Sequence, residues 1–150
     1  MRCPRCVQKI HLAATSCPHC GFTVEQADEL FGDQDVSLQK FSDPAGVMRM
    51  KERKPMRKLM ERFEKRFPQL FVSVYLGAFE EMTSIRQFGF WLLNRAAFSD
   101  VDVNRPNENG ILIVVDVTAK TAGITYGYSL LPYLNDESTF NALSAAHPYL

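Results

Sequence analysis

The sequence predicts an α/β domain, with α+β as the alternative, in which helices cover a mixed sheet behind a small zinc ribbon. Two Cys-x2-Cys pairs near the start indicate the ribbon. Downstream, segments with helical periodicity alternate with short apolar runs, the pattern of a sheet covered by helices. The 150 residues are 46% hydrophobic, which fits a packed core of one ordinary domain plus a small module.

The first segment, residues 1–21, is predicted to be the zinc ribbon. Its cysteine pairs are Cys3 with Cys6 and Cys17 with Cys20, with ten residues between the pairs. Each pair lets a tight turn aim two sulfurs at one point, and four thiolates complete a tetrahedron around zinc. Because sulfur fills every position, this metal is expected to be structural and not catalytic. His11 and His19 are interpreted as turn or solvent-facing residues.

All four cysteines lie within the first twenty residues, and no charged-then-apolar leader follows Met1. Paired cysteines of this spacing are metal ligands where thiols stay reduced, so we expect a cytoplasmic protein. The apolar run at 111–115 is far too short to span a membrane, so no membrane span is expected.

Residues 22–39 are predicted to be an acidic linker, because they contain five Asp or Glu, no Lys or Arg and few apolar residues. A short helical turn is expected near 25–31. The main domain is predicted to occupy residues 40–150.

The next element is an amphipathic helix with Pro55 in its first turn, ended by Pro68. Apolar residues recur along it at intervals of three and four: Met56, Leu59, Met60, Phe63 and Phe67. Within 49–66 there are nine Lys or Arg against three Glu, although the whole chain has zero net charge. Positive charge is therefore concentrated on one helix.

The remaining elements follow from periodicity and capping residues. Residues 69–76 and 110–117 are predicted to be buried strands, because both runs are almost wholly apolar and β-branched. The other expected elements are a helix capped by Thr83 or Ser84, a polar loop at 99–109, a strand at 122–128 hairpinned to 110–117, and a last helix capped by Asn135 or Asp136.

Four stretches in order resemble the TPM domain, the family named for thylakoid, photosystem-repair and receptor-assembly proteins. They are "FSDPAGVM" at 41–48, "FPQLFVSVYL" at 67–76, "FGFWLLNRAAF" at 88–98 and "ENGILIVVDVTAKTAGITYGY" at 108–128. The resemblance covers roughly residues 40–150 and implies a Rossmann-like sandwich. It also implies that the domain assists assembly, or acts as a phosphatase-like hydrolase that uses a divalent ion.

By the same resemblance, Asp43, Asp116 and Asp136 stand at the acidic loop positions that bind a divalent ion, Ca²⁺ or Mg²⁺. Asp116 also ends a predicted buried strand, where crevices of α/β sheets bind ligands. The structural alternative is that Asp43 and Asp136 cap turns or helices, while Asp116 accepts hydrogen bonds from loop amides. No arrangement of residues in the sequence indicates a catalytic nucleophile.

These observations favour a cytoplasmic binding or assembly module that acts through a protein partner or a divalent ion. The partner would bind the zinc ribbon or the basic helix 49–66. The alternatives are the phosphatase-like hydrolase and a nucleic-acid-associated protein. Nucleic acid is disfavoured because Glu52, Glu61 and Glu64 interrupt the basic run, with Glu61 spaced to pair with Lys65.

Overall fold

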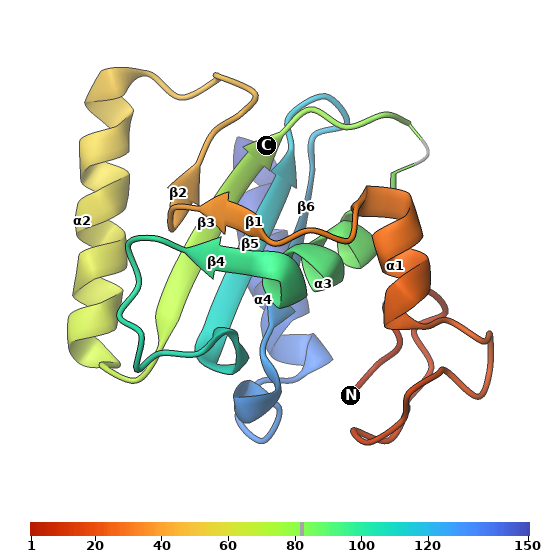
Figure 1. The fold of residues 1–150 in the computed structure, drawn as a ribbon. Helices are drawn as coiled ribbons and strands as arrows, with labels where there is room; N and C mark the ends of the chain where they lie inside the picture. The colour runs from red at the N-terminus through yellow and green to blue at the C-terminus, as the bar shows by residue number, and fades with distance from the viewer. Residues whose placement is uncertain (82) are drawn as a thin grey trace.

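The computed structural model describes residues 1–81 and 83–150 and confirms the α/β class (Figure 1). A four-stranded sheet runs in the order β2-β3-β5-β6. Its strands are β2 (Phe41–Ser42), β3 (Phe71–Gly77), β5 (Gly110–Asp116) and β6 (Thr121–Tyr126). The first three are parallel and β6 is antiparallel to β5, so the predicted mixed sheet and its hairpin are both confirmed.

A second, two-stranded parallel sheet pairs β1 (Val36–Leu38) with β4 (Ala96–Phe98). The helices are α1 (Val24–Phe31), α2 (Met50–Arg66), α3 (Ile85–Arg95) and α4 (Asp136–Ala146). Three short 3₁₀ turns complete the described part of the chain, at Asn107–Asn109, Tyr128–Leu130 and His147–Tyr149.

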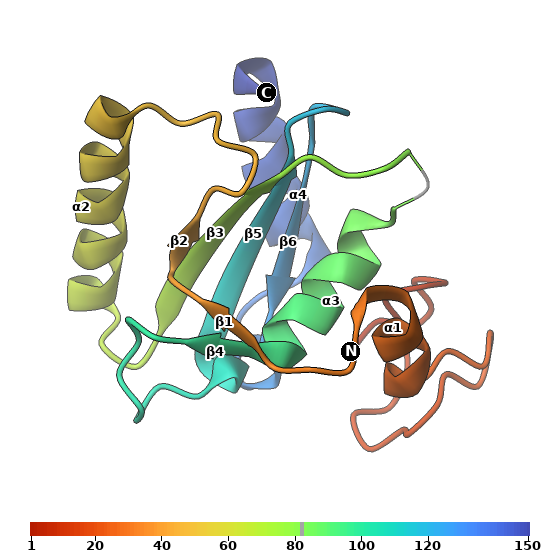
Figure 2. The ribbon, with the colours of Figure 1, turned by 45° about the horizontal axis from the view of Figure 1, so that its top comes forward.

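The two faces of the main sheet bury separate apolar clusters, because alternate residues of each strand point to opposite sides. Leu112 and Val114 of β5 pack with α3, and α1 packs on the far side of α3. Val74 and Leu76 of β3 pack with Met60 of α2 on the other face. Figure 2 shows α3 and α1 on one side of the sheet and α4 on the other, with α2 beside β2 and β3.

The helical turn expected near 25–31 is confirmed as α1, but the segment expected as an acidic linker, residues 22–39, packs on the domain that follows it. It forms α1 and β1, and Ala27 of α1 is fully buried against α3. Asp28 pairs with Arg95 of α3, and the Trp91 indole N–H donates to the Gly32 carbonyl at 2.7 Å. The acidic residues of this segment thus serve in part to hold α1 on the sheet domain.

The predicted basic helix 49–66 is confirmed as α2, but it begins at Met50, so Pro55 lies beyond the first turn in which it was expected. Its start is stabilised by the Glu52 carboxylate, which accepts a hydrogen bond from the backbone N–H of Arg49 at 2.9 Å. Pro55 therefore lies inside α2, where it lacks a backbone donor. The predicted caps Ser84 and Asn135 are confirmed, since each side chain accepts a backbone hydrogen bond at a helix start.

The pair between Asp28 and Arg95 makes stability depend on pH at the acid end. The hydrogen bond from Arg95 holds the pKa of Asp28 below its ordinary value, although desolvation acts in the opposite direction. A lowered folded-state pKa contributes stability that is complete above the unfolded-state pKa of about 3.9 and is lost as pH falls through the folded value.

We therefore expect Asp28→Asn to destabilise the protein at neutral pH, with a difference from wild type that shrinks below about pH 4. Urea denaturation of both proteins across pH measures the difference in stability. Metal loss in acid affects wild type and variant alike, so it does not contribute to that difference. Glu29→Gln, an exposed neighbour on the same helix, is the matched control. A wild-type-to-variant difference that stays constant into strong acid contradicts the prediction.

Candidate metal centre

The four cysteines meet at one point, as their spacing predicts. The sulfurs of Cys3, Cys6, Cys17 and Cys20 all lie within 4.8 Å of one another. Cys3 Sγ is 3.7 Å from Cys20 Sγ, and Cys6 Sγ is 3.6 Å from Cys17 Sγ. Sulfurs placed 2.3 Å from one zinc ion at tetrahedral angles are about 3.8 Å apart. The cluster therefore has the ligands and the dimensions of a four-thiolate metal site.

Two similar turns present these sulfurs. In the first turn the Val7 N–H donates to the Cys3 carbonyl at 3.0 Å, and Val7 adopts a φ of 66°. In the second the Gly21 N–H donates to the Cys17 carbonyl at 2.9 Å, and Gly21 has a φ of 71°. Glycine adopts this left-handed conformation without steric cost, whereas a valine adopts it only at a steric cost. The turns thus point each cysteine pair inward.

The thiols are electrostatically linked. Desolvation opposes ionisation of Cys17, but backbone N–H groups of His19 and Cys20 and the neighbouring thiols lower its pKa to about 6. The backbone N–H of Phe22 favours ionisation of Cys20, yet desolvation and the three other thiols raise its pKa to about 12. Without a cation, one sulfur ionises first, and the repulsion between negative charges suppresses ionisation of the other thiols. A divalent metal removes that repulsion by replacing the protons.

The cluster is seated on the α/β domain, not held apart from it. Cys3 is fully buried and Cys17 is 3% exposed, and both belong to the apolar cluster built around α3. Phe22, just after the last cysteine, packs edge-on against Phe90 of α3 with ring centroids 5.9 Å apart. Metal binding in the ribbon is thereby connected to the packing of α1 and α3.

The structure places Asp43 just after β2, on the face of the sheet covered by α2. Its carboxylate is 1% exposed and accepts hydrogen bonds from the backbone N–H groups of Val47 and Met48 and from Arg53. Arg53 as the partner of Asp43 is not predictable from the sequence. No helical or strand spacing relates two residues ten positions apart across a turn.

Asp116 ends β5, opposite Gly77 of β3, and points to the other face of the sheet. It is 5% exposed and its Oδ1 accepts from the backbone N–H groups of Thr118 and Ala119. Asp136 begins α4 at the opposite end of β5 and β6, where it pairs with Arg2 of the ribbon.

The structure does not bring the three aspartates together. Among the residues it describes, the cysteines are the one set of three or more metal-ligand side chains that meet at a point. The carboxylates of Asp43 and Asp116 already accept bonds from loop amides, which is the structural alternative recognised in the sequence. Ca²⁺ or Mg²⁺ needs several oxygen ligands at once, and the described loops do not assemble them.

The glutamates of α2 also lie differently from expectation. Glu64 turns inward, where its carboxylate pairs with Lys40 at 2.8 Å and Arg105 at 2.9 Å. Glu52 caps the start of the helix. The expected pair between Glu61 and Lys65 is not among the ion pairs of the described residues.

The helices of the described residues include none whose length and apolar character would suffice to cross a membrane. No protein-family model matches this sequence, and a search of curated proteins finds no match either.

Proposed function

We propose that this chain is a cytoplasmic zinc-ribbon module with a TPM-like α/β domain, and that it acts by binding a protein partner. Zinc held by Cys3, Cys6, Cys17 and Cys20 would be structural, because four sulfurs leave no open coordination position. The mixed sheet supports the TPM-like assignment at the level of fold class. The observation that carries the binding role is the uncompensated positive surface of α2.

That surface is more positive than the sequence suggests, because two of the three glutamates are occupied elsewhere. Glu64 pairs inward and Glu52 caps the helix. Of the eight Lys and Arg in α2, only Arg53 makes an ion pair within the described residues. The other seven are exposed: Lys51, Lys54, Arg57, Lys58, Arg62, Lys65 and Arg66. Five of them recur at intervals of three and four along one helix face: Lys51, Lys54, Lys58, Arg62 and Lys65.

Apolar side chains accompany these charges, which favours an acidic protein over a nucleic acid. Leu59 is 56% exposed and Met50 is 80% exposed on the same helix. Protein interfaces combine apolar contacts with a charged rim, whereas nucleic-acid surfaces that read the phosphate backbone need only the cations. An acidic, amphipathic helix has the complementary chemistry.

The test is an anisotropy titration of the full chain with two labelled probes: an amphipathic peptide of Glu and Leu at helical spacing, and a random-sequence DNA duplex. We expect Lys58→Gln with Arg62→Gln to weaken peptide binding by roughly threefold to tenfold at low salt. Leu59→Ser should weaken binding of the peptide and leave binding of the duplex unchanged.

The matched control is Arg86→Gln with Lys120→Gln, which removes two exposed charges away from α2. Peptide binding that this control weakens as much as the α2 variant would refute a specific surface. Tighter binding of the duplex, insensitive to Leu59→Ser, would assign the surface to nucleic acid. The phosphatase-like alternative has no such supporting observation, because the carboxylates it requires lie apart.

A further inference from the structure

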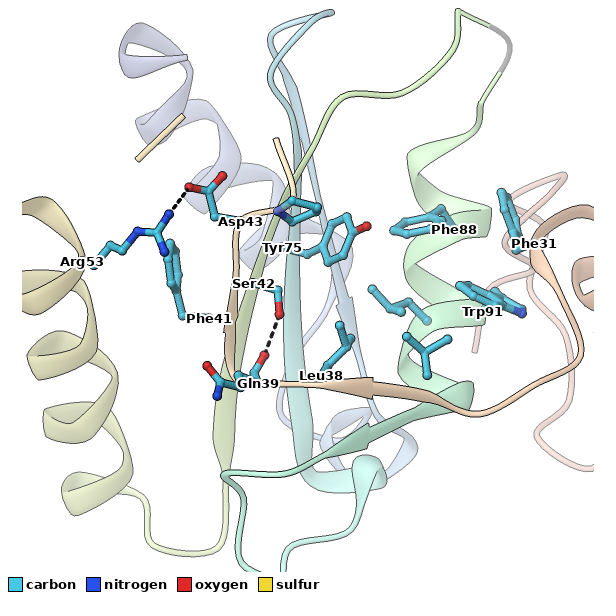
Figure 3. Close-up of a pocket in the computed structure, with 13 residues that line it drawn as sticks. Phe31, Leu38, Gln39, Phe41, Ser42, Asp43, Arg53, Tyr75, Phe88 and Trp91 are labelled. Carbon is cyan, nitrogen blue, oxygen red and sulfur yellow. Dashed lines mark hydrogen bonds and ion pairs between the residues drawn. The ribbon is translucent and has the colours of Figure 1, made fainter. Parts of the chain in front are cut away.

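A cavity of about 560 Å³ lies where α1, β1 and α3 face β2 and β3 (Figure 3). Cavities that bind small molecules measure about 300–1,000 Å³. This one is separate from the cysteine cluster and from the exposed face of α2, so neither the metal site nor the charged surface accounts for it.

Aromatic side chains from four elements line the cavity: Phe31 of α1, Phe41 of β2, Tyr75 of β3, and Phe88 and Trp91 of α3. These rings pack against one another. The ring centroids of Phe31 and Phe88 are 5.4 Å apart, with an angle of 81° between the ring planes. The ring centroids of Tyr75 and Phe88 are 5.3 Å apart. Rings held at such angles present both edges and faces, the arrangement that a further aromatic ring packs against.

The charges at the cavity are balanced internally. Asp43 is almost wholly buried and pairs with Arg53 at 3.1 Å, beside the Phe41 ring. The Trp91 indole N–H is also occupied, because it donates to the Gly32 carbonyl at 2.7 Å. A ligand with a buried net charge would therefore find no uncompensated partner here, so the buried part of the ligand should be uncharged.

Two polar side chains of the wall make no hydrogen bond within the described residues: the Tyr75 hydroxyl and the exposed Gln39 amide. The Tyr75 hydroxyl extends from β3 toward Phe88 and the other rings of α3 (Figure 3). It is open to solvent, because no buried polar side-chain atom of the described residues lacks a hydrogen-bond partner. Burial raises the pKa of Tyr75, so the hydroxyl keeps its proton at neutral pH and can donate it. Among the aromatic side chains that line the cavity, Tyr75 thus offers the free hydrogen-bond donor, because the Trp91 indole N–H is already occupied.

We propose that this cavity binds a planar, uncharged aromatic molecule that accepts a hydrogen bond from the Tyr75 hydroxyl. The rings of Phe31, Phe88 and Trp91 supply the apolar contact, and the hydroxyl sets the orientation of the ligand.

The probe for this test is prodan, a neutral naphthalene carrying a ketone acceptor. Trp91 is the only tryptophan of the chain and lines the cavity, so bound prodan should quench its fluorescence by energy transfer. We expect saturable quenching with one probe per chain, measured on the full zinc-loaded protein.

Three variants locate the binding. Tyr75→Phe keeps the ring and removes the donor, and should weaken binding by roughly threefold to tenfold, the value of one neutral hydrogen bond. Leu38→Phe adds volume to the cavity wall and should weaken it by more. Tyr133→Phe removes the hydroxyl of a residue that is 80% exposed and lies outside the cavity, and should leave binding unchanged.

The proposal is overturned if Trp91 quenching fails to saturate, or if Tyr75→Phe binds prodan as tightly as wild type. Tyr75→Phe decides the matter even where Leu38→Phe folds poorly, because the lost hydroxyl makes no hydrogen bond within the described residues. Equal weakening by Tyr133→Phe would indicate adsorption to the surface and would also overturn it.

Discussion

Removing the metal from the four-cysteine cluster is expected to unfold the ribbon and lower the melting temperature of the whole chain. Structural zinc contributes about 10–16 kcal/mol of apparent binding free energy in zinc-finger peptides. Cys3 and Cys17 are buried among the side chains that pack on α3, so the loss should reach the α/β domain. We expect Cys17→Ser to have a far larger effect than an exposed substitution, which typically changes stability by about 0.5 kcal/mol.

Elemental analysis of protein purified without added metal should give about one zinc per chain for wild type and none for Cys17→Ser. Thermal melting with and without a chelator measures the stability. His19→Asn, a neighbour outside the sulfur cluster, is the control and should retain both metal and melting temperature. A metal-free wild type whose four native thiols all react with an alkylating agent would refute the zinc site.

Acid should release the metal, because protons compete for the sulfurs. Neighbouring thiols and desolvation raise the pKa of Cys20 to about 12 in the absence of a metal, so this sulfur must lose a proton when the metal binds. Zinc uptake at neutral pH should accordingly release protons.

Local patterns predicted the parts of the fold that local interactions determine. The strand at 110–117 and its hairpin follow from an apolar run and a turn, and Asn135 caps the last helix as its position indicates. The cysteine cluster was predictable for the same reason, because its ligand spacing is itself the signal.

Contacts between distant residues were not predictable in this way. Residues 22–39 have the composition of a linker, but Asp28 finds its partner Arg95 at a separation of 67 residues. Likewise, three aspartates in acidic loops suggested an ion site, and only the pairing register of the strands reveals that Asp43 and Asp116 lie on opposite faces. The aromatic cavity could not be predicted from the sequence because its aromatic side chains come from four separate elements.

The packing of the ribbon against α3 is the basis of the second large expected effect, a loss of stability. Phe22→Ala should destabilise the protein by about 3–5 kcal/mol, the usual cost of truncating a buried phenylalanine. Phe22 is 6% exposed and packs against Phe90 within the cluster that contains Cys3 and Cys17. Its backbone carbonyl accepts from the Cys17 N–H at 2.9 Å, and this bond survives the substitution. Zinc content should therefore stay near one per chain.

Urea denaturation of the zinc-loaded protein measures this loss, with Phe140→Ala, a phenylalanine 67% exposed on α4, as the matched control. The double variant Phe22→Ala with Cys17→Ser then separates two arrangements. If the ribbon and the α/β domain unfold as one unit, the double variant loses less stability than the sum of the single losses, because each change removes the same docked ribbon. Strict additivity, or a Phe22→Ala loss no larger than that of Phe140→Ala, would mean that the ribbon folds independently of the domain beneath it.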